Sequence, residues 1–550
     1  MADTVREKDP RAEEAFRRYD EMRAERRRFE GDWNSIAALI RPQRGGFGMD
    51  SPTLRQIAKP LSSDPVVAHG NFAAGIYAGI TNPARRWAGF ETPDEDLNKW
   101  QPMAEWNDKV TRAVMKSFSP SMSSFYSATY QAYADLSAFG NAGSYSEIDQ
   151  GQRKFVDVTV SLSEMVAAVD FHGRVNEVGR KFRLTGRAAA RQFGIKSLPK
   201  AVRKAAETGD QQKFAFVHHV LPNDRFVRRA LGARGKAWLS VYACEEDMSL
   251  VRLRGYDDMP FDFPRWDVDT GFTYGTGPGM VALPSARVNN RMQDATVRAA
   301  QRAADPTKLA PDRNVIPLSG TFRPGSVVYG ATDIRGNALV KSEDFNGNIG
   351  LTLEEKRAHV EAVNNAFYYT VMSLTGRTGL SDEENRVIEE ARLRNWAPHA
   401  DRVMEEYGAR KCERRFRQLW RAGQLPPPPD GIPADMPLQV TYQSQSAMAL
   451  RASEANSIRK FVGDLLPLAQ VNPRYMDRID PDAHIEALHD ADAALPASML
   501  RPREEADKLA QQRAEQAQMA QAMEMAQAGG GVMKDLAAAG AAGQGQGGER

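Results

Sequence analysis

One predicted helix carries a line of arginines on one face and a line of apolar residues opposite them. The arginines are Arg287, Arg291, Arg298 and Arg302, and the apolar residues are Val288, Met292, Ala295 and Ala299. At about 100° per residue the four guanidinium groups fall within roughly 60° of one another. Such a face contacts DNA phosphates without reading base sequence, or it pairs with carboxylates of a neighbouring copy of the chain. The spacing alone leaves both alternatives open.

Other residues suited to catalysis or ligand binding lack the spacing that their chemistry requires. The Gly-x-Gly-Pro-Gly run at 275–279 begins like a dinucleotide-binding loop, but its proline and the missing final glycine break the pattern. His218 and His219 are adjacent, so on a strand they point to opposite faces and do not share a metal. The acidic groups at 257–258 and 382–384 have no companion histidine, and we expect solvated loop charges there. We therefore predict no catalytic residues, no cofactor and no metal.

The bulk properties limit the class of protein. Hydrophobic residues make up 42% of the 550 residues and charged residues 26%, a globular composition. The 73 Lys and Arg nearly balance the 71 Asp and Glu, so any DNA contact must arise from local charge. Cys244 and Cys412 lie far apart, which fits a reducing compartment. The charged first residues and the lack of a long apolar run predict neither a signal peptide nor a membrane span.

The predicted helices and strands that surround the arginine helix indicate an α+β fold. Helical periodicity covers 11–40, 69–80 and 105–140, and short strands around a helical insertion at 185–208 fill 155–265. The arginine helix is predicted from Ala286 to Ala304, where no Gly or Pro interrupts it.

Strand and turn character follows over 308–350, and helix returns at Thr352, whose spacing to Glu355 is that of a capping box. This helix is expected to run to about Leu374 along an apolar stripe of Val360, Val363, Phe367 and Val371. A long charged helix from 386 to 422 ends at four prolines. Shorter helices over 450–500, one over 503–527 and a Gly-rich tail complete the chain.

Several segments resemble, in the same order, the head-to-tail connecting (portal) proteins of short-tailed bacteriophages. They are RRYDEMRAERRRFEGDWNSIAALIRPQRGGF, with Phe29, Trp33, Ile40, Pro42 and Phe47; HGNFAAGIYAGITNPARRW, with Thr81, Pro83 and Trp87; PRWDVDTGFTYGTGPGMVALPSARVNNRMQ at 264–293; and DPTKLAPD at 305–312. The resemblance spans about residues 11–430. It departs from the family at TGLSDEEN, where relatives often carry a Thr-Ala-Thr-Glu-type sequence.

The resemblance implies a portal fold: a mainly helical wing, stem and crown with a small β-containing clip. It divides the chain into an N-terminal α+β wing at 1–280, a first stem helix at 281–304, a clip at 305–351, a second stem helix at 352–374, a tunnel loop at 375–385, a long wing helix with the following linker and strand at 386–449, a helical crown or barrel at 450–527 and a disordered tail at 528–550.

The same resemblance implies a function and a set of partners. Subunits would form a ring, usually of twelve, at the unique capsid vertex of the virion, after assembly in the host cytoplasm. Double-stranded DNA would pass through without sequence-specific contact, and Arg377 and Arg386 join the four helical arginines as channel candidates. The other partners would be the terminase large subunit, tail adaptor or nozzle proteins, and capsid and scaffolding proteins. The competing interpretations are a structural tail or adaptor protein and a metal-dependent DNA-processing enzyme.

Overall fold

The structure is a computed structural model of the 550-residue chain. It describes residues 9–44, 47, 59–84, 86–149, 151, 154–304, 308–309, 332–342, 349–369, 399–432, 439–442, 457–465, 467, 479–491, 499–501 and 505–521. The chain divides into two compact units, one of Met1–Ala88, Arg112–Leu425 and Ser444–Ser446, the other of Gly89–Thr111, Pro426–Gln443 and Ala447–Arg550. Helices and antiparallel sheets alternate along the first unit, which confirms the α+β class.

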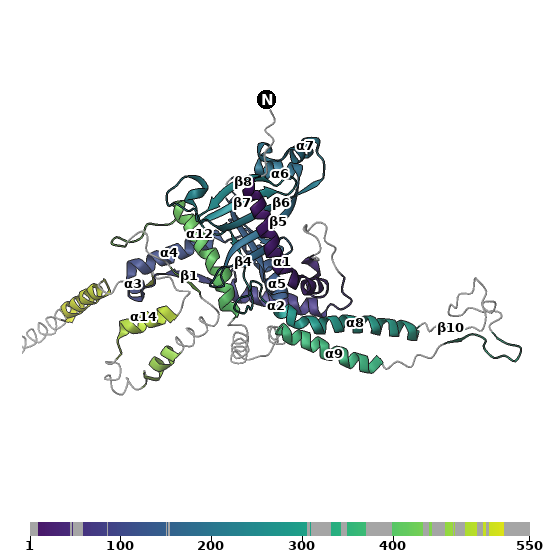
Figure 1. The fold of residues 1–550 in the computed structure, drawn as a ribbon. Coiled ribbons are helices and arrows are strands. Elements are labelled where there is room, and N and C mark those ends of the chain that lie inside the picture. Colours follow the sequence, from purple (N-terminus) through teal and green to yellow (C-terminus); the bar gives the residue numbers. More distant parts are fainter. Residues whose placement is uncertain are drawn as a thin grey trace, which may run out of the picture. The chain divides into compact units, whose positions relative to one another are not determined.

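A five-stranded antiparallel sheet lies at the centre of the first unit (Figure 1). Its order is β4 (Met165–Val169), β5 (Val175–Thr185), β6 (Lys213–Pro222), β7 (Trp238–Cys244) and β8 (Ser249–Tyr256). The predicted helical insertion is present as α6 (Gly186–Phe193), the 3-10 turn η3 (Ile195–Ser197) and α7 (Lys200–Thr208). A further 3-10 turn, η4 (Gly232–Gly235), lies between β6 and β7.

Helices cover both faces of this sheet. The helix α1 (Pro10–Leu39) buries Phe16 and Tyr19 against Val217 on one face. The helices α6 and α7 pack against Phe216 on the other face. Neighbouring residues of a strand point to opposite faces, so the alternation at 216 and 217 sets which helix each side chain meets.

A second layer holds α5 (Phe125–Phe139) against the three-stranded sheet of β3 (Lys154–Val160), β2 (Gly143–Asp149) and β9 (Phe261–Asp262). The single helical stretch predicted over 105–140 is wrong. The structure has α4 (Gln101–Ser117) and α5 separated by a turn at 118–124. Pro120 has no N–H to donate, and the Ser123 hydroxyl accepts a hydrogen bond from the Phe125 N–H at 3.0 Å, so a new helix begins there.

The helices α2 (Asp64–Ile80), α8 (Pro278–Ala304) and α9 (Ile349–Ala366) complete the region that carries the arginines. Helix α8 begins eight positions before the predicted start at Ala286, and Pro284 lies inside it. Proline at this position removes one hydrogen bond of an early turn, but the helix continues through it.

Helix α9 differs from prediction at both ends. It begins at Ile349, so Thr352 lies within the helix and the predicted capping box is wrong. It ends at Ala366, before a turn in which Tyr368 adopts φ 50°, so the helix predicted to continue past this point is interrupted. Leu374 itself lies outside the described residues. Figure 1 shows α8 and α9 side by side, with the antiparallel pair β10 (Lys308–Leu309) and β11 (Lys341–Ser342) beyond them.

The predicted long charged helix is present where the structure describes it, from residue 399. It includes a π-helical turn, η6 (Met404–Ala409), and α12 (Arg410–Arg421), and ends close to the predicted Ala422. The 3-10 turn η1 (Pro42–Arg44) follows α1.

The second unit is made of short elements. It contains α3 (Glu95–Lys99), α14 (Pro481–Ala491) and most of the pair formed by β1 (Ala88–Glu91) and β12 (Gln439–Tyr442). Residues 457–465 and 505–521 are helical as predicted, and the tail at 528–550 lies outside the described residues. Among the described helices, none is both long and apolar enough to cross a bilayer.

Candidate nucleic-acid interface

The start of α8 is fixed by close backbone packing against the end of α5. A Cβ on Gly279 would lie 2.1 Å from the Ala138 carbonyl oxygen, and one on Gly277 would lie 2.7 Å from the Gly140 Cα. The Asn141 side chain donates to the Gly275 carbonyl at 2.8 Å and accepts from the Gly275 N–H at 2.8 Å. The glycine run therefore serves helix packing, and it sets the direction in which α8 leaves the core.

Aromatic side chains from the segments that resemble the head-to-tail connecting family pack together beside this contact. Trp33 of α1 is fully buried, with its ring centroid 5.3 Å from that of Phe47 and 5.7 Å from that of Tyr274. Phe29 lies 5.8 Å from Trp33, and Phe47 lies 5.2 Å from Phe139. Rings at these separations contribute stabilisation beyond their buried area. The cluster ties α1 to the segment that precedes α8.

Polar contacts hold the first half of α8 to the segment before α2, whereas further along the helix Gln293 accepts a hydrogen bond from Lys356 of α9 at 2.5 Å. The Asn289 side-chain amide donates to the Ser62 hydroxyl at 3.0 Å, and the Asn290 side-chain Oδ1 accepts from the Leu61 N–H at 2.8 Å, just before α2. Asn289 is the last fully buried residue of the helix. From there to Ala304 the helix is half-buried or exposed, so its second half is available to other molecules.

The structure places the four helical arginines on an exposed face, as predicted. Arg287 pairs with Asp32 of α1 at 3.0 Å, and Arg298 pairs with Asp294 of its own helix at 2.8 Å. Within the described residues, Arg291 and Arg302 have no ion-pair or hydrogen-bond partner. Arg377 and Arg386 lie outside the described residues.

The predicted apolar line of α8 is not its buried side, and at about 100° per residue it lies roughly 80° from the arginines instead of opposite them. Val288 and Met292 are half-buried and Ala295 is exposed. The buried side is instead the line through Ala282, Ala286 and Asn289, because α5 and α2 pack there. It lies roughly opposite the arginines on a helical wheel.

Exposed carboxylates on α9 keep the second interpretation of the arginine face open. Glu354, Glu355 and Glu361 are all exposed on the helix that runs beside α8. If copies of the chain lie side by side, these carboxylates can form ion pairs with the guanidinium groups of a neighbouring copy. Charge placement in one subunit therefore fits DNA contact and subunit pairing equally well.

Rings anchor both ends of the segment 370–398, which contains Arg377 and Arg386. Phe367 and Tyr368, which follow α9, lie 6.1 Å and 5.7 Å from the Phe72 ring of α2. His399, at the other end, stacks on Trp266 at 4.9 Å, and Trp266 lies 5.6 Å from Phe72. The chain thus leaves and re-enters the fold at neighbouring side chains.

A buried histidine completes this anchoring region. His69 of α2 contacts the Phe367 ring at 5.8 Å, and its Nε2 lies 2.8 Å from the Ala134 carbonyl oxygen. A carbonyl only accepts, so Nε2–H is the donor. Burial, together with the charge of Arg41, lowers the pKa of His69 to about 3, and the imidazole is neutral at pH 7.

An ordered turn lies between β10 and β11 in the chain. The Asp333 carboxylate accepts hydrogen bonds from the N–H groups of Arg335 and Asn337, each at 2.8 Å, and Gly336 adopts φ 81°. The turn holds Ile334 fully exposed at 107%. Ile334 is thus presented to solvent by a turn that its own hydrogen bonds hold in shape.

Sequence reasoning missed a buried ionic network beneath α12. Lys411 and Arg415 pair with Asp157 of β3 at 2.9 and 2.7 Å, and Arg414 pairs with Asp262 of β9 at 2.5 Å. All five side chains are at most 7% exposed. A helix rich in Lys and Arg is usually a solvated surface helix. The close spacing of Lys411, Arg414 and Arg415 among apolar residues is therefore the only sequence feature that could have indicated a buried network.

The charges of this network decide the ionisation of Asp157. Burial alone would raise its pKa, but Lys411 and Arg415 outweigh burial and hold the pKa below the ordinary value. Ion pairs extend along α12: Asp257 pairs with Arg421 at 2.9 Å, and Asp258 pairs with Arg417. The expectation that the acidic pair at 257–258 is merely solvated is therefore wrong. The group at 382–384 lies outside the described residues.

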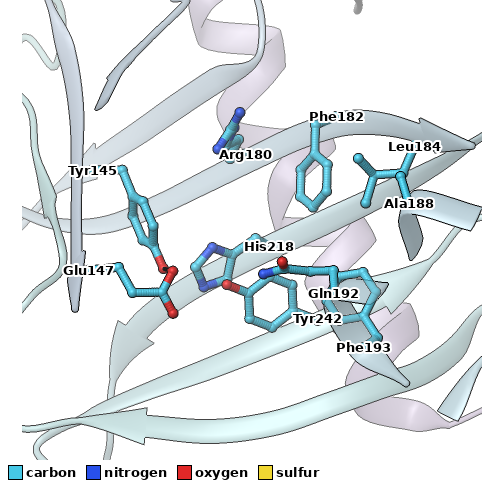
Figure 2. Close-up of a pocket in the computed structure, with 10 residues that line it drawn as sticks. All are labelled: Tyr145, Glu147, Arg180, Phe182, Leu184, Ala188, Gln192, Phe193, His218 and Tyr242. Carbon is cyan, nitrogen blue, oxygen red and sulfur yellow. Dashed lines mark hydrogen bonds between the residues drawn. The ribbon is translucent and has the colours of Figure 1, made fainter. Parts of the chain in front are cut away.

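The two adjacent histidines have separate partners, as predicted from strand geometry. His219 contacts Glu177 at 2.7 Å, on the face covered by α1. His218 lies on the other face, in a cavity of about 310 Å³ (Figure 2), where it stacks on Tyr242 at 3.9 Å and contacts Ser240 at 3.0 Å. Burial lowers the pKa of His218 well below its ordinary value. Cys244 and Cys412 are both buried and free.

Comparison with known proteins identifies the family. Residues 12–500 match the family model described as bacteriophage head to tail connecting protein. The chain belongs to this family. This head-to-tail connecting protein is 27% identical to the portal protein of Salmonella phage epsilon15, over 98% of this chain and 96% of the relative. It is 28% identical to the probable portal protein of Bordetella phage BPP-1, over 92% of this chain and 91% of the relative.

Two solved particle structures are more distantly similar to this head-to-tail connecting protein. One is titled virion of native gene transfer agent particle, with 12% identity, 73% of this chain and 88% of the other covered, and a TM-score of 0.31. The other is titled neck of empty gene transfer agent particle, with 11% identity, 78% and 90% covered, and a TM-score of 0.36.

Proposed function

We propose that the chain is a portal subunit, which forms a ring at the capsid vertex and provides the passage for DNA during packaging and ejection. One observation carries the proposal: the family match over residues 12–500 includes a helical hairpin, α8 and α9, whose second half stands clear of the core with a basic face exposed. Repeated around a ring, that face would line a channel with positive charge. The role is structural and needs no catalysis.

The regions of the proposed portal subunit are assigned from their positions in the chain relative to α8 and α9. Helices α8 and α9 would be the stem. Residues 305–351, of which the last three form the first turn of α9, would be the clip that meets terminase and the tail adaptors. Residues 375–385 would be the tunnel loop, supported by the ring anchors on either side of 370–398. Capsid and scaffolding proteins would contact the wing. The crown at 450–527 belongs to the second unit.

Within the channel, we propose that Arg291 and Arg302 contact DNA phosphates. Arg287 and Arg298 are already paired within the subunit, which leaves the other two as the available cations among the described residues of α8. Translocation requires contacts that exchange quickly, and a few exposed, salt-screened cations per subunit meet that requirement.

Electron microscopy of the purified protein tests the ring directly. We expect ring-shaped particles with a central hole, and subunit counting gives the stoichiometry, for which twelve is the expectation. A monodisperse monomer at high protein concentration, with no ring after addition of scaffolding protein, would contradict the proposal.

Charge reversal at Arg291 and Arg302 tests the channel assignment. We expect Arg291→Glu with Arg302→Glu to form rings of normal size but to package less DNA in a terminase-driven assay. Lys196→Glu with Lys204→Glu, at exposed positions on or beside α7, changes the net charge by the same amount and should package normally. Loss of the ring itself would show that the arginines pair between subunits. Rescue of that ring by Glu354→Arg and Glu361→Arg would identify their partners.

A further inference from the structure

The loop between β6 and β7 is both strongly basic and apolar at its surface. Five cations and one carboxylate lie between Asn223 and Ala237: Arg225, Arg228, Arg229, Arg234, Lys236 and Asp224. Three apolar side chains are exposed among them, Phe226 at 47%, Val227 at 57% and Leu231 at 96%. Contiguous exposed apolar groups beside arginines are typical of protein-binding surfaces.

The loop is held in one shape by hydrogen bonds of its own. The Asn223 amide donates to the carbonyls of Ala233 and Lys236 at 3.0 and 2.8 Å, and the Val227 N–H donates to Arg234 O at 2.9 Å. Arg229 adopts φ 68°, a conformation that costs a non-glycine residue free energy. A surface kept in a strained shape while it exposes apolar groups is preorganised for a contact.

The opposite end of β7 carries the complementary charge. The turn at 245–247 presents Glu245, Glu246 and Asp247, all exposed. Strand β7 separates this turn from the basic loop by seven residues, or roughly 23 Å at about 3.3 Å per residue. Lys181 pairs with Glu245, and Lys236 of the basic loop pairs with Asp257. Within the described residues, Arg225, Arg228, Arg229, Arg234 and Glu246 have no side-chain ion partner.

We propose that the basic loop 223–237 docks onto the acidic turn 245–247 of the next copy of the chain. The inference rests on the proposed ring, because two different patches on one subunit make a head-to-tail contact that closes only in a ring. Charge complementarity selects the occupant. Nucleic acid would use the arginines but leave Phe226, Val227 and Leu231 in water, whereas a protein surface covers both.

A charge-swap experiment tests the contact. We expect Arg225→Glu with Arg228→Glu to lower the fraction of chain in rings by about tenfold, because like charges would then face each other. Glu246→Lys with Asp247→Lys should do the same, and all four changes together should restore the rings. Lys196→Glu with Lys204→Glu, at exposed positions on or beside α7, is the control of equal charge change and should leave assembly normal.

Cross-linking gives a second readout that does not depend on the charge variants. Cysteines at Leu231 and Glu246, oxidised with diamide, should join subunits into a ladder of covalent multimers, while either cysteine alone should not. Both natural cysteines are buried and give a low background.

The outcomes separate this contact from the ring itself. If neither swapped pair affects ring formation, or if the fourfold variant fails to restore rings while remaining folded by circular dichroism and giving no ladder, the contact is wrong and the ring stands. If rings persist and only binding to a DNA fragment is lost, the loop binds nucleic acid and this inference is overturned. If the unmodified chain forms no ring under any condition, the proposed function fails and the contact fails with it.

Discussion

Replacing Asp157 with asparagine should strongly destabilise the first unit. The carboxylate is fully buried and accepts hydrogen bonds from Lys411 at 2.9 Å, Arg415 at 2.7 Å, Ser123 at 2.8 Å and Ser146 at 2.7 Å. Asparagine keeps the volume but removes the charge, so buried Arg415 loses its counter-ion and Lys411 keeps only Asp262, at 3.3 Å. Removing one partner of a buried ion pair typically costs about 3–5 kcal/mol, a large part of the roughly 5–15 kcal/mol that a folded domain has.

The same carboxylate makes stability depend on pH. The pKa of Asp157 is depressed in the fold, so its stabilisation is complete above about pH 4, the ordinary Asp value, and is lost as the pH falls through the lower folded pKa. We therefore expect the wild-type chain to lose stability below about pH 4 more steeply than Asp157→Asn, which has no proton to take up at this position.

Urea unfolding followed by tryptophan fluorescence measures both effects, at neutral pH and in steps down to pH 3. Asp20→Asn, at an exposed position of α1, is the matched control and should change the free energy of unfolding by less than about 0.5 kcal/mol. If Asp157→Asn also changes the free energy of unfolding by less than about 0.5 kcal/mol at neutral pH, the network beneath α12 does not stabilise the fold as argued.

Three further changes test other parts of the structure. Gly279→Ala should cost more than about 3 kcal/mol or abolish folding, because its Cβ would meet the Ala138 carbonyl, whereas Gly31→Ala, with open space around it, should not. His69→Gln should flatten the loss of stability as pH falls from about 6.5, where an unfolded histidine takes up a proton, toward the folded pKa of about 3; unchanged slopes would count against this. Ile334→Ser should weaken adaptor binding in a pull-down while leaving the melting temperature unchanged, and full retention of binding would exclude Ile334 as a contact.

The sequence predicted the elements better than their ends. Helical periodicity in the sequence located α1, the arginine helix and the insertion at α6 and α7. It misplaced the ends of α8 and α9, because tertiary contacts decided them. Backbone packing at Gly279 makes α8 begin before the predicted Ala286. Ring contacts at Phe367 accompany the end of α9, which comes before the last residue of the predicted apolar stripe, Val371.

Side-chain partners were the least predictable feature. The exposure of Arg291 followed from the helix pattern, but the ion pair of Arg287 with Asp32 joins residues far apart in the chain, which periodicity does not relate. The cations Lys411, Arg414 and Arg415 belong to the predicted charged helix, but the sequence did not indicate that they are buried, because Asp157 and Asp262 arrive from two different strands. Only a three-dimensional arrangement brings such charges together.

The ring anchors at either side of 370–398 hold the two ends of that segment close together. The ends meet the fold at Phe72 and Trp266, whose ring centroids lie 5.6 Å apart. The departure from the family sequence, TGLSDEEN, falls inside this segment. A change of sequence at that position therefore leaves the anchoring rings themselves unchanged, so both points of attachment are kept when the sequence between them varies.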